Sequence, residues 1–201
     1  MMRTVTSVDT EIHRIAADMM TAQTKGDLGA MLVREVKRFD RYDLAVISAR
    51  VRQDINLLPM PYREKFRPYA EKWFFGRYHE LLKSDRDGVW AQMQEPITDR
   101  ETFEKYFRMI PDACLREEQD VPYPGDNERM VPFYRLFYYL LCAFAIFVRD
   151  EPGHPMGTPF PGGFTVHTKR GICYCPIRDK EEEIWHSICN FCPVLQDPDN
   201  L

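Results

Sequence analysis

Residues 130–148 read MVPFYRLFYYLLCAFAIFV, and this apolar stretch decides the fold class. Pro132 and Arg135 interrupt it, so the longest unbroken apolar run, residues 136–148, covers thirteen positions. A helix that spans a membrane needs about 20 apolar residues. We therefore predict a helix at the centre of a water-soluble bundle, with other helices packed on several sides of it, and no membrane segment.

Amphipathic patterns before this stretch predict a series of helices. They cover residues 7–25, a segment from residue 27, residues 44–55, 62–83 and 98–110. Gly26 is expected to end the first helix and Asp27 to cap the second. Thr98 and Glu101 have the spacing of a capping box. Pro111 is expected to end the helix before it, and residues 121–127, which contain two prolines and a glycine, are expected to form a loop.

The composition changes at Asp150, after which prolines and glycines alternate and exclude a helix. Residues 164–167 and 172–175 flank a short polar segment and predict a β-hairpin in which Gly171 adopts a positive φ. The predicted fold is therefore mainly α. It has a helical bundle over residues 1–150, followed by a small irregular module over residues 151–201 that packs on the bundle.

Overall charge and the amino terminus limit the function classes. The 201 residues include 27 Lys and Arg against 31 Asp and Glu, a formal charge of −4. A protein that binds nucleic acid non-specifically normally carries a basic surplus, so we expect no nucleic-acid partner. Residues 1–6 lack the apolar stretch of a signal peptide, so a cytoplasmic location is expected.

Four of the six cysteines lie close together near the carboxyl end, as Cys173, Cys175, Cys189 and Cys192. In a reducing compartment, two close pairs joined by a loop are better explained as metal ligands than as disulfides. They predict a structural zinc site, because four thiolates close the tetrahedral shell. His154 is an alternative to Cys173 as the fourth ligand. An iron–sulfur cluster, or thiols without metal, remain the alternatives for this segment.

A second group of candidates lies in the sequence FFGRYHE at residues 74–80. His79 could act as a general base, with Glu80 or Arg77 meeting an anionic substrate in a pocket between this helix and the loop at residues 153–163. The metalloprotease helix pattern fails, because Lys83 stands where the second histidine is required. The competing interpretation is an aromatic core with a satisfied polar edge.

The ordered motifs resemble a known family. FFGRYHE at residues 74–80, GTPFPGGF at 157–164, YCP at 174–176 and the Cys189 and Cys192 pair are similar to an uncharacterised archaeal family of methanogens, domain of unknown function 2115. The resemblance covers most of the chain. It implies a cytoplasmic protein of an anaerobic cell, and it implies no assigned activity.

The resemblance also bears on the ligands, since Cys175, Cys189 and Cys192 match the family pattern and the fourth ligand stays open between Cys173 and His154. From the residues we expect a non-catalytic binding or accessory protein, whose aromatic residues would suit a protein partner. The alternative is an enzyme whose pocket uses His79, Glu80 and Arg77, together with His154 from the loop.

Overall fold

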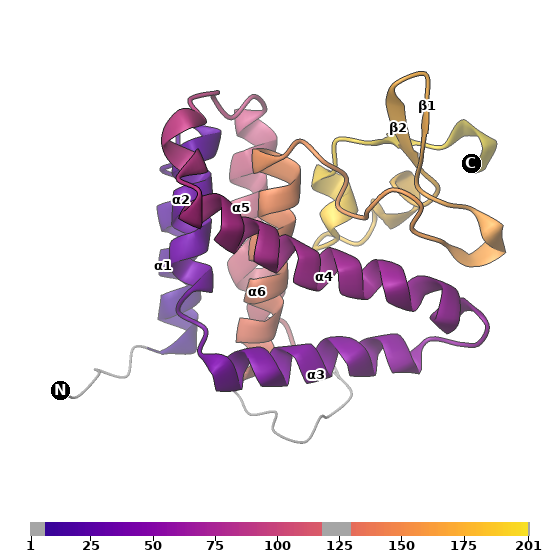
Figure 1. Ribbon diagram of the computed structural model, residues 1–201, viewed down its shortest axis with the longest axis horizontal. Coiled ribbons are helices and arrows are strands. Elements are labelled where there is room, and N and C mark those ends of the chain that lie inside the picture. The colour runs from indigo at the N-terminus through magenta and orange to yellow at the C-terminus, as the bar shows by residue number, and fades with distance from the viewer. Residues whose placement is uncertain (1–6, 118–129, 201) are drawn as a thin grey trace.

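The computed structural model describes residues 7–117 and 130–200 (Figure 1). Most of this part of the chain is helical, so the predicted mainly α class is confirmed. The helices are α1 (Val8–Met19), α2 (Lys25–Val36), α3 (Arg41–Leu57), α4 (Tyr62–Arg86), α5 (Arg100–Leu115) and α6 (Met130–Ala143). A 3-10 turn, η1 (Val89–Gln92), follows α4, and a π-helical turn, η2 (Phe144–Val148), continues α6.

Helix α6 and its π-helical extension form the centre of the core, as predicted. Residues 131–148 are long and apolar enough to cross a membrane by length and composition, but 78% of this segment is buried inside the protein. Helices α2, α4 and α5 pack against α6. The all-round apolar character of the stretch is therefore explained by helices on several sides of it.

The start of α2 differs from the sequence-based prediction. Its N-cap is Thr24, whose hydroxyl accepts a hydrogen bond from the Asp27 amide at 3.0 Å, while the Asp27 carboxylate accepts one from the Thr24 amide at 2.9 Å. Asp27 is thus the second half of a capping box, and Gly26 lies inside the helix. A β-carbon on Gly26 would lie 2.2 Å from the carbonyl oxygen of Trp90, so close packing explains this glycine.

The boundaries of α5 also differ from the prediction. Asp99 is the N-cap, with its carboxylate accepting from the Thr102 amide at 3.0 Å, so the predicted capping box of Thr98 with Glu101 is wrong. The helix continues through Pro111 to Leu115. Proline has no backbone N–H, so the helix loses one hydrogen bond at Pro111. Burial of the apolar side chains around Pro111 offsets this loss. The loop predicted at residues 121–127 lies outside the described residues.

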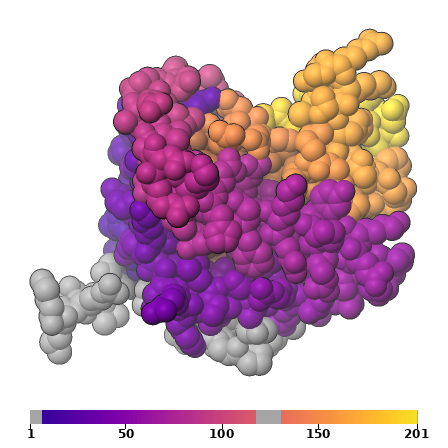
Figure 2. Space-filling view, viewed as in Figure 1, coloured from indigo at the N-terminus to yellow at the C-terminus, as the bar shows by residue number. Residues whose placement is uncertain are grey.

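In Figure 2 the orange and yellow atoms of the C-terminal module lie against the purple atoms of α4. This module contains a small three-stranded sheet. Strands β1 (His167–Lys169) and β2 (Ile172–Cys175) form a hairpin, as predicted, but the first strand lies nearer the turn than the expected residues 164–167. The turn is therefore only Arg170 and Gly171, which both have positive φ, at 55° and 82°. This is the pattern of a two-residue type I′ turn. Strand β3 (Leu195–Gln196), which was not predicted, pairs with β2 in parallel.

Apolar and polar contacts both attach the module to the bundle. Ile188 is buried in the same apolar cluster as the bundle helices. The Tyr139 hydroxyl on α6 donates a hydrogen bond to the carbonyl of His186 at 3.0 Å. The module therefore completes one side of the bundle core.

Candidate functional site

Local structure in the module positions three of the candidate cysteines. Cys175 ends β2, Cys189 lies in the 3-10 turn η5 (Ile188–Phe191), and Cys192 caps that turn. The Ser187 hydroxyl accepts from the Cys189 amide at 3.3 Å and fixes the start of the turn. The pairing of β3 with β2 then holds the residues just after Cys192 against Cys175, since the Asp197 amide donates to the Cys175 carbonyl at 2.9 Å.

Cys175, Cys189, Cys192 and His154 line one cavity of about 10 Å³, which we call the thiol cavity. Apolar side chains complete most of its wall, and the Gly153 amide donates to the Cys192 sulfur at 3.3 Å. Cys173 is not part of this lining. It lies two residues back on β2, half-buried, with its sulfur 3.7 Å from the Thr168 hydroxyl.

The thiol cavity is not a preformed coordination site. Within residues 7–117 and 130–200, no group of three or more His, Cys, Asp or Glu side chains is arranged to hold a metal ion. The four side chains therefore converge on a common space without the geometry of a tetrahedral centre. A metal would require the side chains to turn toward one another.

Burial sets the protonation of these side chains. It raises the pKa of the Cys189 thiol to about 12 and also raises the pKa values of Cys175 and Cys192, with the amide of Gly153 opposing the shift at Cys192. Burial lowers the pKa of His154 to about 4. At neutral pH the cavity therefore contains thiols and a neutral imidazole, whose nitrogen lone pair suits a metal.

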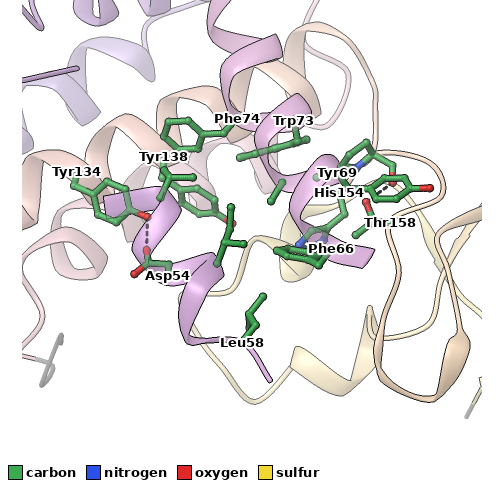
Figure 3. A pocket seen from close by; sticks show the side chains of 15 residues that line it. Asp54, Leu58, Phe66, Tyr69, Trp73, Phe74, Tyr134, Tyr138, His154 and Thr158 are labelled. Atoms are coloured by element: carbon green, nitrogen blue, oxygen red, sulfur yellow. Dashed lines mark hydrogen bonds between the residues drawn. The ribbon is translucent and has the colours of Figure 1, made fainter. Parts of the chain in front are cut away.

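A larger cavity, of about 270 Å³, lies where α3, α4 and α6 meet the loop after the bundle (Figure 3). We call it the aromatic cavity. Its lining comprises Val51, Asp54, Ile55, Leu58, Phe66, Tyr69, Ala70, Trp73, Phe74, Tyr134, Tyr138, Gly153, His154, Pro155 and Thr158. The sequence placed a pocket between the helix at residues 62–83 and this loop, and a cavity lies there. His154 belongs to the walls of both cavities.

The predicted catalytic candidates lie elsewhere on α4. His79 is exposed and lines neither the thiol cavity nor the aromatic cavity. Arg77 contacts Glu80 at 2.8 Å and also pairs with Glu151. Arg149 lies 3.1 Å from Glu80 and completes a four-residue ion cluster. Arg77 and Glu80 thus join α4 to the chain after α6, and they do not converge with His79 on a cavity.

Sequence reasoning placed His79, Glu80, Arg77 and His154 at this pocket, and of these four only His154 lines the aromatic cavity. A signal for other lining residues was available in the sequence. Phe66, Tyr69 and Trp73 recur at spacings of three and four, which places them on one face of α4. That face meets the loop that contains His154. Tyr134 and Tyr138 on α6, also four residues apart, supply the opposite wall in the same way.

Relatives of the chain come from methanogens. The UPF0305 protein of Methanothermobacter thermautotrophicus is 27% identical over 176 residues, which cover 88% of this chain and 98% of that protein. The corresponding protein of Methanopyrus kandleri is 32% identical over 141 residues, 70% and 88% of the two chains. That of Methanocaldococcus jannaschii is 26% identical over 175 residues, 87% and 97% of the two.

No solved structure matches the chain. Residues 24–197 match the family described as an uncharacterized protein conserved in archaea, DUF2115. This match covers most of the described helices and the cysteine module, and it confirms the resemblance noted from the motifs. The chain therefore belongs to the DUF2115 family of archaeal proteins.

Proposed function

We propose that this protein is a non-catalytic binding or accessory protein, whose C-terminal module is stabilised by a structural zinc ion. The ligands are Cys175, Cys189, Cys192 and His154. The observation that carries the proposal is that these four side chains line one small buried cavity. His154 is preferred to Cys173 as the fourth ligand because Cys173 is outside that lining.

The donor set fits zinc in chemistry, although the side chains must reorient to bind it. Three sulfurs and one neutral imidazole are a common set for a closed, structural zinc site. The Gly153 amide already donates to the Cys192 sulfur, an interaction that stabilises a thiolate. When bound, the ion would supply on the order of 10 kcal/mol of folding free energy. The module needs this stabilisation because its own apolar cluster is small.

The module also supports the binding role, because it carries exposed apolar side chains. Ile172, Ile184, Trp185 and Leu195 are 40% to 54% exposed. A rigid module that presents such side chains suits a protein partner. The formal charge of −4 again disfavours nucleic acid. We keep the expected cytoplasmic location, with which the burial of residues 131–148 is consistent.

The alternatives receive less support from the geometry. An enzyme that acts through His79 requires that side chain at a cavity, and His79 lines neither the thiol cavity nor the aromatic cavity. An iron–sulfur cluster is most often held by four thiolates, whereas three cysteines line the thiol cavity.

Metal analysis of protein purified without oxygen tests the proposal. We expect about one zinc per chain, because four ligands make one tetrahedral site. Cys175→Ser should lose the zinc, whereas Cys173→Ser, a change on the same strand, should retain it. If the protein is purified without metal and its melting temperature equals that of a zinc-loaded sample, the zinc site is rejected. Iron in the sample, together with a brown colour, would indicate an iron–sulfur cluster and not a zinc ion.

A further inference from the structure

The thiol cavity and the aromatic cavity share one wall. Among the described residues, Gly153 and His154 are the two that line both cavities. The two cavities therefore lie on different sides of one short segment, which we call the shared wall. A movement of this segment on one side changes the space on the other side, because protein interiors are closely packed.

Close contacts with the module hold the thiol side of the shared wall. The Gly153 amide donates to the Cys192 sulfur at 3.3 Å, so the backbone of the wall is attached to a proposed zinc ligand. A β-carbon on Gly153 would lie 2.8 Å from the Ile188 side chain, so the backbone has no spare room there. The His154 ring packs edge-on against Phe160, with ring centroids 5.5 Å apart. A change at the thiol cavity is therefore felt directly by the shared wall.

The loop after the shared wall connects the module to the helices. Thr158 lines the aromatic cavity, and its carbonyl accepts a hydrogen bond at 3.1 Å from the amide of Val166, which lines the thiol cavity. Gly157 lies against α4, since an added β-carbon there would be 3.1 Å from the Tyr69 ring. Residues 153–158 thus form a closely packed connection from the cysteines to the ring-lined face of α4 (Figure 3).

Metal binding would change the position of His154 in the shared wall. This step rests on the proposed zinc site, in which His154 is the fourth ligand. Within the part of the chain that the structure describes, the ligand side chains line one space without being arranged to hold a metal, so coordination requires them to turn toward one another. The His154 ring must then point to the thiol side, and the volume that it occupied at the aromatic cavity becomes free.

We propose that zinc in the thiol cavity enlarges the aromatic cavity, which then binds an uncharged, apolar small molecule more tightly than in the metal-free chain. The ligand class follows from the lining, which consists mainly of aromatic and aliphatic side chains and disfavours a charge. An engineered apolar cavity of about 150 Å³ binds benzene. At about 270 Å³, the aromatic cavity has room for a molecule of that kind or somewhat larger.

Benzene and naphthalene are probes of two sizes for this cavity. Their affinities are measured by NMR titration of the full chain, metal-free and zinc-loaded. Naphthalene should bind the zinc-loaded chain about fivefold more tightly than the metal-free chain, and benzene, which is smaller, should change less. Because coupling between two sites is reciprocal, saturation with naphthalene should tighten zinc binding by the same factor.

Metal analysis of the same samples separates failure of the coupling from failure of the zinc site. If the chain binds about one zinc and its naphthalene affinity is unchanged, the coupling is refuted and the zinc site stands. If the chain takes up no zinc, the zinc site is refuted and the coupling with it. If neither form binds naphthalene, the aromatic cavity is not a site for an apolar molecule.

Substitutions test the route through His154. His154→Ala removes the ring from the shared wall, so metal-free His154→Ala should bind naphthalene about as tightly as the zinc-loaded unaltered chain. Cys189 lines the thiol cavity but not the aromatic cavity, so Cys189→Ser should keep the metal-free naphthalene affinity whether or not zinc is added. Cys173→Ser, outside both linings, is the control and should respond to zinc like the unaltered chain. Metal-free His154→Ala that binds naphthalene no better than the unaltered chain would overturn the role of His154.

Discussion

Zinc binding in the thiol cavity should be strongly pH-dependent. Burial raises the pKa values of Cys175, Cys192 and Cys189, the last to about 12, so all three are protonated thiols in the metal-free protein at neutral pH. A zinc ion binds thiolates, so its uptake must release these protons. His154, with a pKa of about 4, is already neutral and releases none.

The size of the effect follows from the proton count. Release of three protons makes the apparent Kd for zinc fall about a thousandfold per unit rise in pH, which equals about 4 kcal/mol. Affinity therefore rises with pH across the whole range in which the thiols are protonated. Competition with a chromophoric chelator, at about pH 6.5 and about pH 7.5, measures the slope once the chelator's own protonation is subtracted.

The outcome distinguishes the ligand sets. Cys173→Ser should keep a slope of about three protons, because Cys173 is outside the proposed shell. A slope of about four protons in the unaltered chain, falling to about three in Cys173→Ser, would show that the fourth ligand is Cys173 and not His154. A slope near zero would refute thiolate binding altogether. Calorimetry in buffers of different ionisation enthalpy counts the released protons independently.

Three further changes test the fold around these sites. Since the pKa of His154 is about 4 in the folded protein against 6.5 for the ordinary group, the free energy of unfolding of the metal-free protein should fall by about 3 kcal/mol as the pH is lowered from about 6.5 to about 4. His154→Gln should lose less, which urea denaturation at the two ends of this pH range measures. Gly29→Ala should lower the free energy of unfolding by about 1–3 kcal/mol, because its β-carbon would lie 2.4 Å from the Trp90 ring. Gly76→Ala, which has open space around the added carbon, should raise it by about 0.5–1 kcal/mol. Equal effects of the two changes in denaturant unfolding would contradict the packing at Gly29. Tyr106→Phe removes the buried hydrogen bond of 2.6 Å from the Tyr106 hydroxyl to the Tyr139 carbonyl and should lower the free energy of unfolding by about 1–2 kcal/mol. A lowered Tm would confirm this effect, and an unchanged Tm would contradict it.

Helix positions were predictable from the sequence, but helix ends were less so. The apolar run at residues 136–148 required burial on all sides, and α6 with its π-helical turn is buried there. Thr24 and Asp27 are both good capping residues, so composition could not choose between them. The close approach of Trp90 to Gly26 shows why that glycine continues a helix instead of ending one.

The cysteine group was predictable in part. Spacing indicated that Cys189 and Cys192 lie close together and that a hairpin contains Cys175, and these three line one cavity. Cys173 lies on the same strand but outside the lining of that cavity, which spacing alone could not show. Strand β3, which pairs with β2, has two residues and is too short to leave a sequence pattern. The ion cluster of Arg77, likewise, requires the approach of Glu151 from a distant part of the chain.

By itself, the sequence determined a helical bundle around one apolar helix and a cysteine-bearing module at its end, because burial of apolar faces and the conformational limits of proline and glycine act locally. Only the tertiary structure decided which side chains share a space. It brought His154 between the thiols and a ring-lined cavity and left His79 exposed, because residues distant along the chain meet only when the helices and the module pack together.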